Sequence, residues 1–172
     1  RMDLMETIRE RRSIRKFQPD PVDESDLKEI IQSGILAPNA ENDQMWRFIV
    51  VTKKKLIMQM SDIVSAKFDA IDQACRALGY DELGKQKYFS VFFGLAPAII
   101  VAFCRPFLTV EDKALNTLNM QLKSPIAMFS VQQSMGAALQ NITLAAHAKG
   151  YGTTWMTGPL IADQEIADLL EV

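Results

Sequence analysis

Apolar residues recur at helical spacing near the start of the chain. An amphipathic helix is predicted over residues 2–9. Its apolar side consists of Leu4, Met5 and Ile8. A second helix should begin after Asp23, whose carboxylate can cap it, and end at Ala37, because Pro38 disfavours helix in the residue before it. Its apolar positions are Leu27, Ile30, Ile31, Gly34 and Ile35.

The strongest helical pattern in the chain covers residues 125–149. One apolar face consists of Met128, Val131, Met135, Leu139, Ile142 and Ala146. Small residues make up much of the remainder, which is typical of a helix buried on both sides, so we expect a central helix or one at a subunit interface. Pro125 suits the first turn of this helix and Gly150 its end. A last helix should be capped by Asp163.

The middle of the chain has weaker patterns. Residues 53–79 predict helix in two pieces, and residues 80–87 are polar and predict a mobile connection or lid. The apolar stripe of the first segment consists of Phe68, Ile71, Cys75 and Leu78. Residues 105–124 contain a proline and several polar residues, and this pattern assigns no firm element to them.

Three short runs predict strands. Residues 48–52 are β-branched and apolar, and residues 97–104 form a continuous apolar run that should be buried on both faces. Residues 152–157 form the third run and lead into Gly158, where a glycine lets the main chain approach a ligand closely. A few strands separated by helices, without repeats or linkers, predict one α+β or α/β domain over residues 1–172.

Four cations and one hydroxyl lie within residues 11–17, here named the cationic segment. In an extended chain Arg11, Ser13 and Arg15 project to one side, and the residues between them project to the other. Guanidinium groups suit phosphate oxygens, and a serine hydroxyl adds a compact donor. The segment is therefore a candidate anion site, and the alternative from the residues alone is a solvated basic turn.

Residues 37–48 are polar at first and aromatic at their end. Their amide side chains carry both donors and acceptors, which suits the edge of a heterocycle. An asparagine-rich turn before a strand is equally consistent with this pattern. His147 lies in the last turn of the long helix, and we interpret it as structural or solvated because no carboxylate or cysteine lies at ligand spacing.

Composition argues against several classes of function. The formal net charge of −2 argues against a nucleic-acid-binding protein. No apolar run reaches the roughly 18 residues that span a bilayer, and the N-terminus lacks the apolar core of a signal peptide, so we expect a cytoplasmic protein without a membrane partner. Cys75 and Cys104 form no disulfide or metal-binding pattern and are expected to be buried thiols, and no metal site is predicted.

Together, three segments resemble the signature blocks of the FMN-dependent nitroreductase family. They are residues 11–15, residues 37–50 and residues 145–159, and their order and separation match over nearly the whole chain. The resemblance implies an α+β nitroreductase-like fold, in which helices flank a small mixed or antiparallel sheet and a long central helix lies at a homodimer interface. It also implies FMN as the cofactor, bound at two sites built from both subunits.

The resemblance also assigns residues to this cofactor. The residues implied at its phosphate, ribityl chain and pyrimidine edge are Arg11, Arg12, Ser13 and Arg15. The residues implied to approach the flavin from the partner subunit are Pro38, Asn39, Ala40 and Asn42. The residues implied to place main-chain amides beside the reactive N5 and the ring carbonyls are Met156, Thr157 and Gly158. No catalytic side chain is expected, because such a cofactor carries the chemistry itself.

The chain departs from the family pattern at several points. Met45 stands where a proline is common, and Asn39 where serine is frequent. Family members usually continue past the last helix into a tail with a basic residue for the FMN phosphate, and this sequence ends at Val172. Either the chain is shortened, or it is a minimal member whose phosphate contacts come from the cationic segment.

The activity implied is that of an FMN-dependent NAD(P)H oxidoreductase, which reduces nitroaromatics, quinones or similar flat electrophiles by ping-pong hydride transfer through flavin N5. Negative charge then develops at flavin N1 and the C2 carbonyl, where Arg15 would stabilise it. One alternative is a flavin-binding or regulatory protein with the same fold and little turnover. Another is a specialised relative that removes halide or consumes flavin.

Overall fold

The computed structural model describes residues 3–80, 83–105, 107–120 and 126–172. By its internal contacts the chain divides into two compact units. Unit 1 consists of residues 1–11, 23–49 and 100–152, and unit 2 of residues 12–22, 50–99 and 153–172. The single domain expected over residues 1–172 stays a prediction.

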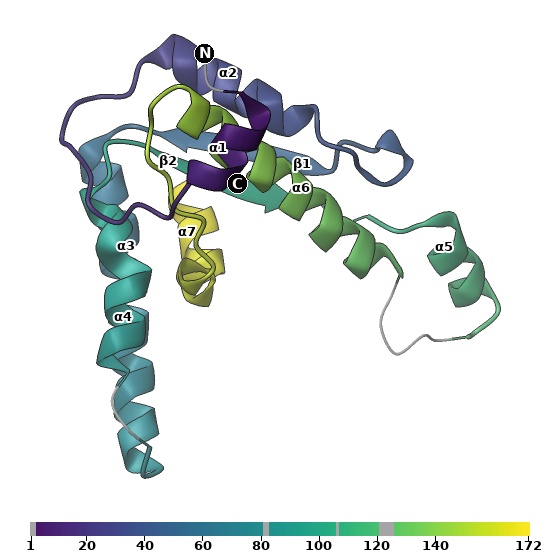
Figure 1. The fold of residues 1–172 in the computed structure, drawn as a ribbon. Coiled ribbons are helices and arrows are strands. Elements are labelled where there is room, and N and C mark those ends of the chain that lie inside the picture. The colour runs from purple at the N-terminus through teal and green to yellow at the C-terminus, as the bar shows by residue number, and fades with distance from the viewer. Residues whose placement is uncertain (1–2, 81–82, 106, 121–125) are drawn as a thin grey trace. The chain divides into compact units, whose positions relative to one another are not determined.

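Helices dominate the described residues, and one small sheet accompanies them (Figure 1). The α-helices are α1 (Leu4–Glu10), α2 (Glu24–Ile35), α3 (Lys54–Ala77), α4 (Gly84–Val91), α5 (Val110–Thr117), α6 (Ile126–Ala148) and α7 (Asp163–Leu169). The strands are β1 (Trp46–Val51) and β2 (Ile99–Cys104). The 3₁₀ helices are η1 (Ala40–Asn42), η2 (Phe92–Leu95) and η3 (Gly158–Ala162).

The two strands pair with each other and run antiparallel. The main-chain N–H of Arg105 donates to the carbonyl of Met45 at 2.9 Å, which places the end of β2 beside the start of β1. The predicted class of fold, a small sheet with flanking helices, is therefore confirmed.

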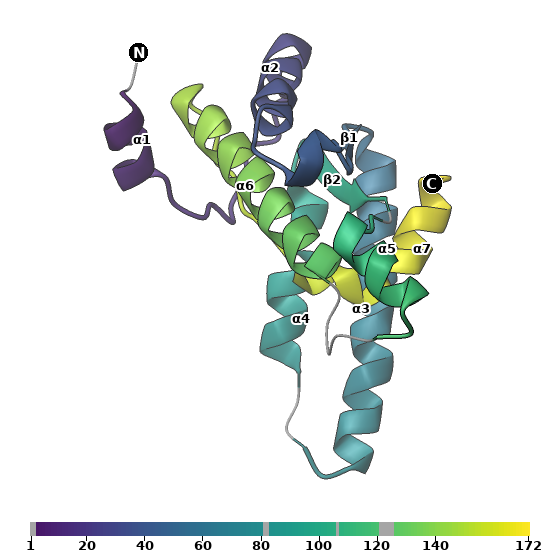
Figure 2. The ribbon, with the colours of Figure 1, turned by 90° about the vertical axis from the view of Figure 1, so that its right-hand side faces the viewer.

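Unit 1 is built around α6, which crosses α2 (Figure 2). Ile30 of α2 packs against Ile142 of α6 in one buried cluster. A methyl group at Gly34 would lie 2.8 Å from the Ile142 side chain, so α2 approaches α6 this closely only because residue 34 is a glycine. Phe48 of β1 and Ile100 of β2 pack against the same cluster, which joins the helices to the sheet.

Unit 2 is built around α3, which packs against α4, α7, η2 and η3. The buried residues of α3 are Ile57, Met60, Val64 and Phe68. The helices α3 and α4 run antiparallel (Figure 2). The N–H of Leu83 donates to Asp72 at 2.7 Å, and Lys87 pairs with Asp69 at 2.5 Å, so the start of α4 is attached to α3 through polar contacts.

The helical predictions hold with corrections. The region 53–79 contains one helix, α3, rather than two pieces. The predicted apolar stripe of this helix ends in Leu78, which is 74% exposed because the buried face of α3 stops at Phe68. Residues 84–87 belong to α4 rather than to a mobile connection, and residues 81–82 lie outside the described part. Helix α2 ends at Ile35, two positions before the predicted end.

The last two helices follow the prediction closely. Helix α6 matches the predicted long helix, whose proposed first residue, Pro125, is outside the described residues. Gly150 adopts a φ of +89° just after α6, as expected of a glycine there. Asp163 is the first residue of α7 rather than its cap, and its carboxylate accepts a hydrogen bond from the N–H of Gln164.

The predictions about strands and cysteines fare less well. Residues 152–157 form no strand, because Thr153 alone pairs there, in one bridge to Ser13. Strand β2 is half-buried for most of its length rather than buried on both faces, because the sheet has two strands among the described residues. Cys75 is half-buried and Cys104 exposed, so the expectation of two buried thiols is wrong.

Candidate functional site

In unit 2 the cationic segment lies beside the residues that follow the long helix. Ser13 and Thr153 form a parallel bridge, and the N–H of Ile14 donates to the carbonyl of Thr153 at 2.9 Å. The hydroxyl of Thr154 donates to the carbonyl of Ile14, 140 positions away in the sequence. Two of the three segments that resemble a flavin-binding family are therefore adjacent in this unit.

The cationic segment keeps its polar side chains accessible at this bridge. Arg12, Ser13 and Arg15 are all exposed. Ile14 is 39% exposed, so it is a weak anchor. Phe17 holds the segment instead, by stacking on Phe92 of η2 with ring centroids 6.2 Å apart and planes 16° apart.

Helix α4 contributes an aromatic ring to the same region. The guanidinium carbon of Arg15 lies 5.5 Å from the ring centroid of Phe89, which is the geometry of a cation–π interaction. Phe89 in turn meets Tyr88 edge-on, with centroids 5.2 Å apart and planes 78° apart. The contact of Arg15 with Phe89 was not predicted from the sequence. Residues 80–87 were assigned to a connection or lid, and no helix was predicted beyond them.

Gly158 lies against α4 as well. A methyl group at this position would lie 2.9 Å from Cβ of Ser90 and still closer to its hydroxyl, so residue 158 can only be a glycine with the chain in this position. Ser90 is buried, and its hydroxyl donates to the carbonyl of Gln86 at 2.8 Å. The sequence predicted that Gly158 lets the main chain approach a ligand closely. In the structure, the group that lies close to Gly158 is Ser90 of α4.

The remaining site residues predicted from the sequence belong to unit 1. Arg11 follows α1, and its N–H donates to the carbonyl of Thr7 at 3.0 Å. The turn that follows α2 contains Pro38, Asn39, Ala40 and Asn42. This turn is attached to α6 through the N–H of Ala40, which donates to the hydroxyl of Ser134 at 3.4 Å.

The amide of Asn39 is used inside this turn. Its oxygen accepts from the N–H of Gln44 at 2.8 Å, and its nitrogen donates to the carbonyl of Ala37 at 3.4 Å. Asn42 adopts a φ of +52°, which asparagine tolerates better than most residues. The contacts of Asn39 are therefore those of an asparagine-rich turn, one of the two interpretations of this segment. Recognition of a heterocycle by these residues stays a prediction.

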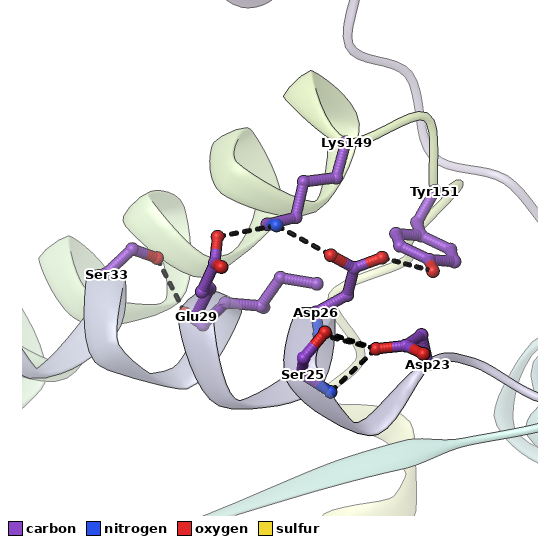
Figure 3. Close-up of polar contacts among 8 residues, drawn as sticks. Asp23, Ser25, Asp26, Glu29, Ser33, Lys149 and Tyr151 are labelled. Atoms are coloured by element: carbon purple, nitrogen blue, oxygen red, sulfur yellow. Dashed lines mark hydrogen bonds and ion pairs between the residues drawn. The ribbon is translucent and has the colours of Figure 1, made fainter.

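A charged cluster at the end of α6 was not found from the sequence (Figure 3). Lys149 pairs with Asp26 and with Glu29, each at 2.6 Å, and the hydroxyl of Tyr151 donates to Asp26 at 2.7 Å. These contacts join the first turns of α2 to the end of α6.

The cluster shifts the pKa values of its members. Hydrogen bonds to Asp26 and then to Glu29 raise the pKa of Lys149 to about 12. The bonds from Lys149 and then from Tyr151 lower the pKa of the Asp26 carboxyl, and the bond to Asp26 raises the pKa of Tyr151. Each shift favours the charge state that the cluster requires: Asp26 ionised, Lys149 protonated and Tyr151 neutral.

Two further predictions concern His147 and the ability of the helices to cross a membrane. His147 is half-buried, and its Nε2 has no hydrogen-bond partner among the described residues, so the structural or solvated role expected for it stays a prediction. Within the described ranges, every helix is too short or too polar to be a candidate for crossing a membrane.

Comparison with known proteins decides the family. Residues 8–172 match the sequence model of the nitroreductase family. The chain belongs to the nitroreductase family. The resemblance that the sequence suggested is thereby confirmed over nearly its whole length.

Individual relatives within the nitroreductase family are distant. The chain is 27% identical over 154 residues to a protein of Archaeoglobus fulgidus provisionally named NADH dehydrogenase/NAD(P)H nitroreductase, covering 90% of this chain and 67% of that protein. It is 27% identical over 164 residues to 5,6-dimethylbenzimidazole synthase of Rhodospirillum rubrum, covering 94% of this chain and 71% of that enzyme. In both comparisons the chain spans only about two thirds to three quarters of the relative.

The fold of this nitroreductase-family chain matches a solved structure closely. A BluB-like flavoprotein from Clostridium difficile 630 superimposes with a TM-score of 0.90 at 28% identity, covering 99% of this chain and 81% of that one. The predicted nitroreductase-like fold is confirmed by this match.

Proposed function

We propose that this chain is an FMN-dependent NAD(P)H oxidoreductase that reduces nitroaromatics, quinones or similar flat electrophiles by ping-pong hydride transfer. The observation that carries the proposal is the pairing of Ser13 and Ile14 with Thr153 and Thr154, which joins the cations of one segment to the segment that leads into Gly158. Membership of the nitroreductase family supports the reaction class. The names of relatives, an NAD(P)H nitroreductase and a flavoprotein, support the nicotinamide and the flavin.

The residues present in unit 2 fit a phosphorylated flavin. Arg12 and Arg15 are exposed cations, and the hydroxyl of Ser13 lies between them in sequence, which together form a donor set suited to phosphate and carbonyl oxygens. Gly158 has no side chain to keep a planar ring from its main chain. We assign Arg12, Ser13, Arg15, Met156, Thr157 and Gly158 to cofactor binding. The roles of Arg11, Pro38, Asn39, Ala40 and Asn42 rest on the family resemblance.

The family resemblance implies the roles of these residues. When bound, FMN supplies hydride transfer at its N5 atom between the nicotinamide and the second substrate. Arg15 stabilises the negative charge that develops at the pyrimidine end of the ring, and it does so without a proton transfer. Thr157 and Gly158 supply main-chain donors near N5. Arg12 and Ser13 hold the phosphate and the ribityl chain.

We infer that two copies of the chain form a homodimer. Several large apolar side chains of unit 1 are more than two fifths exposed on α1 and α6, and a partner subunit would cover them. They are Leu4, Met5, Ile8, Met128 and Phe129. Burial of such a surface drives association because it removes apolar area from water.

The test is an absorbance spectrum of the purified protein, recorded without oxygen before and after addition of NADH or NADPH. The proposal predicts a flavin spectrum that bleaches with at least one nicotinamide and returns when a quinone or nitroaromatic is added. Protein that binds no FMN when FMN is supplied would disprove it. Bound flavin that neither nicotinamide bleaches would favour the alternative of a flavin-binding protein with little turnover, and loss of flavin or release of halide would indicate a specialised relative.

A further inference from the structure

We propose that Phe89 is a positioning residue for Arg15, and that the end of α4 with the start of η2 aligns the flavin-binding segments of unit 2. This inference rests on the proposed function, because it assigns a role toward the same cofactor. Three side chains within four positions carry it, and each contacts a different part of the candidate site. They are Phe89, Ser90 and Phe92.

The first contact fixes the guanidinium group. Arg15 is exposed, so its long side chain would sample many rotamers in water, and binding a ligand would require that freedom to be lost. The ring of Phe89, 5.5 Å from the guanidinium carbon, restrains the group and keeps its charge. The guanidinium plane leaves its N–H donors at the rim, where they stay available to a carbonyl oxygen.

The other two contacts fix the main chain on either side. Ser90 lies so close to Gly158 that residue 158 admits no side chain. Phe92 stacks on Phe17 at the end of the cationic segment, with centroids 6.2 Å apart. A shift of α4 would therefore move Arg15, Gly158 and Phe17 together. Residues 84–87, which the sequence suggested as part of a connection or lid, form the start of the same helix.

The test compares FMN affinity, measured by quenching of flavin fluorescence, in a set of variants. Phe89→Leu keeps an apolar side chain and removes the π face, and we expect the Kd to rise about two- to fivefold, the range of an exposed cation–π contact. Phe89→Trp restores a π face and should bring the Kd back toward that of the wild type. Tyr80→Leu removes an exposed aromatic residue of unit 2 from outside this region and should leave the Kd unchanged.

A double-mutant cycle separates positioning from general packing. In an Arg15→Gln background, Phe89→Leu should have no further effect on the Kd, since the cation is already absent. An equal effect of Phe89→Leu in both backgrounds, or a Kd unchanged from wild type, would overturn the inference and leave the proposed function standing. Failure of the wild-type protein to bind FMN would overturn both.

A second readout needs no cofactor. In FMN-free protein the NMR resonance of the Arg15 side-chain N–H should be shifted upfield, because the group lies over the face of an aromatic ring. Phe89→Leu should remove this shift and Tyr80→Leu should not. Absence of the shift from wild-type protein would show that the contact does not persist in solution and would overturn the inference.

Discussion

Arg15 brings positive charge to the candidate site, and neighbouring residues hold it in position. It follows the bridge between Ser13 and Thr153, and it is restrained by the ring of Phe89. Its planar guanidinium presents several N–H donors in a fixed geometry that suits carbonyl and phosphate oxygens. The electrostatic part of the proposed reaction therefore depends on this one side chain more than on any other assigned to unit 2.

Replacing Arg15 by Gln should slow reduction of the bound flavin by about 10²-fold, in the range found when one donor to a developing oxyanion is removed. Stopped-flow absorbance under anaerobic conditions measures this rate. Lys16→Gln removes one positive charge at the next position and serves as the matched control, with a much smaller effect expected. Equal losses from both variants would mean that net charge, rather than the position of Arg15, matters.

Replacing Gly158 by Ala should destabilise the protein by about 1–3 kcal/mol, as overpacking of a tight contact usually does. The added methyl would meet the buried side chain of Ser90 on α4. The urea midpoint measures this change. Gly84→Ala is the control, because a methyl there meets nothing within 4 Å and lies at the start of the same helix. If both variants unfold at the same midpoint, the contact between α4 and residue 158 is wrong.

Residue-level prediction from the sequence succeeded where the contacts are local. Asp23 caps α2 through the N–H groups of Ser25 and Asp26, as its position before an acidic first turn indicated. Lys149 and Asp26 are 123 positions apart, and no periodicity links them. The ring of Phe89 was equally hidden, since the sequence does not say which arginine an aromatic residue meets.

At the scale of elements, α2 and α6 are held together at one end by charges. The cluster of Asp26, Glu29, Lys149 and Tyr151 joins them there, while Ile30 and Gly34 pack against α6 further along. Because apolar packing does not titrate, the pH dependence of this helix pair should come from the cluster.

Replacing Asp26 by Asn should lower the unfolding midpoint, and the difference from wild type should depend on pH. The pKa of Asp26 is lowered in the folded state, chiefly by Lys149, so its stabilisation is present above the unfolded pKa of about 3.9 and is lost as the pH falls through the folded pKa. The gap should therefore stay constant from about pH 7 to about pH 5 and close below about pH 4. Urea titrations at several pH values measure it.

Glu24→Gln is the matched control for this variant. Glu24 lies on the same helix and pairs with Lys28, but both side chains are largely exposed, and such pairs contribute little. A gap as large for Glu24→Gln as for Asp26→Asn would indicate that helix charge in general, rather than the cluster, is responsible.

Replacing Asp72 by Ala should loosen α4 without unfolding the protein. Asp72 accepts the N–H of Leu83 at 2.7 Å and pairs with Arg76 at 2.9 Å, so its loss leaves the start of α4 attached to α3 mainly through Lys87 and Asp69. Amide hydrogen exchange in α4 should become faster, because local opening costs less. Asp62→Ala, at an exposed position of α3, should leave this exchange unchanged.

Element-level prediction succeeded for the long periodic segments and for several short ones, and it failed in three places. Helix α6 was found almost to its bounds, whereas α4 was not predicted, because most of its residues are polar or exposed to solvent. Helix α5 was not assigned, although Thr109 and Asp112 form a capping box that the sequence contains. The predicted third strand failed because one residue pairs where a strand needs several.

At the scale of the whole molecule, the proposed homodimer is the main testable property. Replacing Phe129 of α6 by Lys should dissociate the dimer, because it places a charge in the apolar face expected to be covered. Sedimentation velocity should then give a monomer. Leu78→Lys, at an apolar and even more exposed site just after α3, should leave the dimer intact. A wild-type protein that sediments as a monomer would contradict the proposal.

The sequence identified the family of the molecule better than it identified its architecture. Three separated blocks in the right order sufficed for the family, and the family model matches residues 8–172. The division of the chain into two units, each made of three segments, was not predictable, since it depends on contacts between residues far apart in sequence. The assignment of individual residues to a ligand stays a prediction.

The contact of Ser90 with Gly158 makes the sizes of two side chains interdependent. If both positions were randomised in one library and variants were selected for retained flavin, residues larger than glycine at 158 should be recovered only with glycine at 90. Among natural sequences with the same helix in this place, substitutions at the two positions should then occur in pairs. Such paired changes would show that the close approach of α4 to residue 158 is kept while the residue that supplies the space changes.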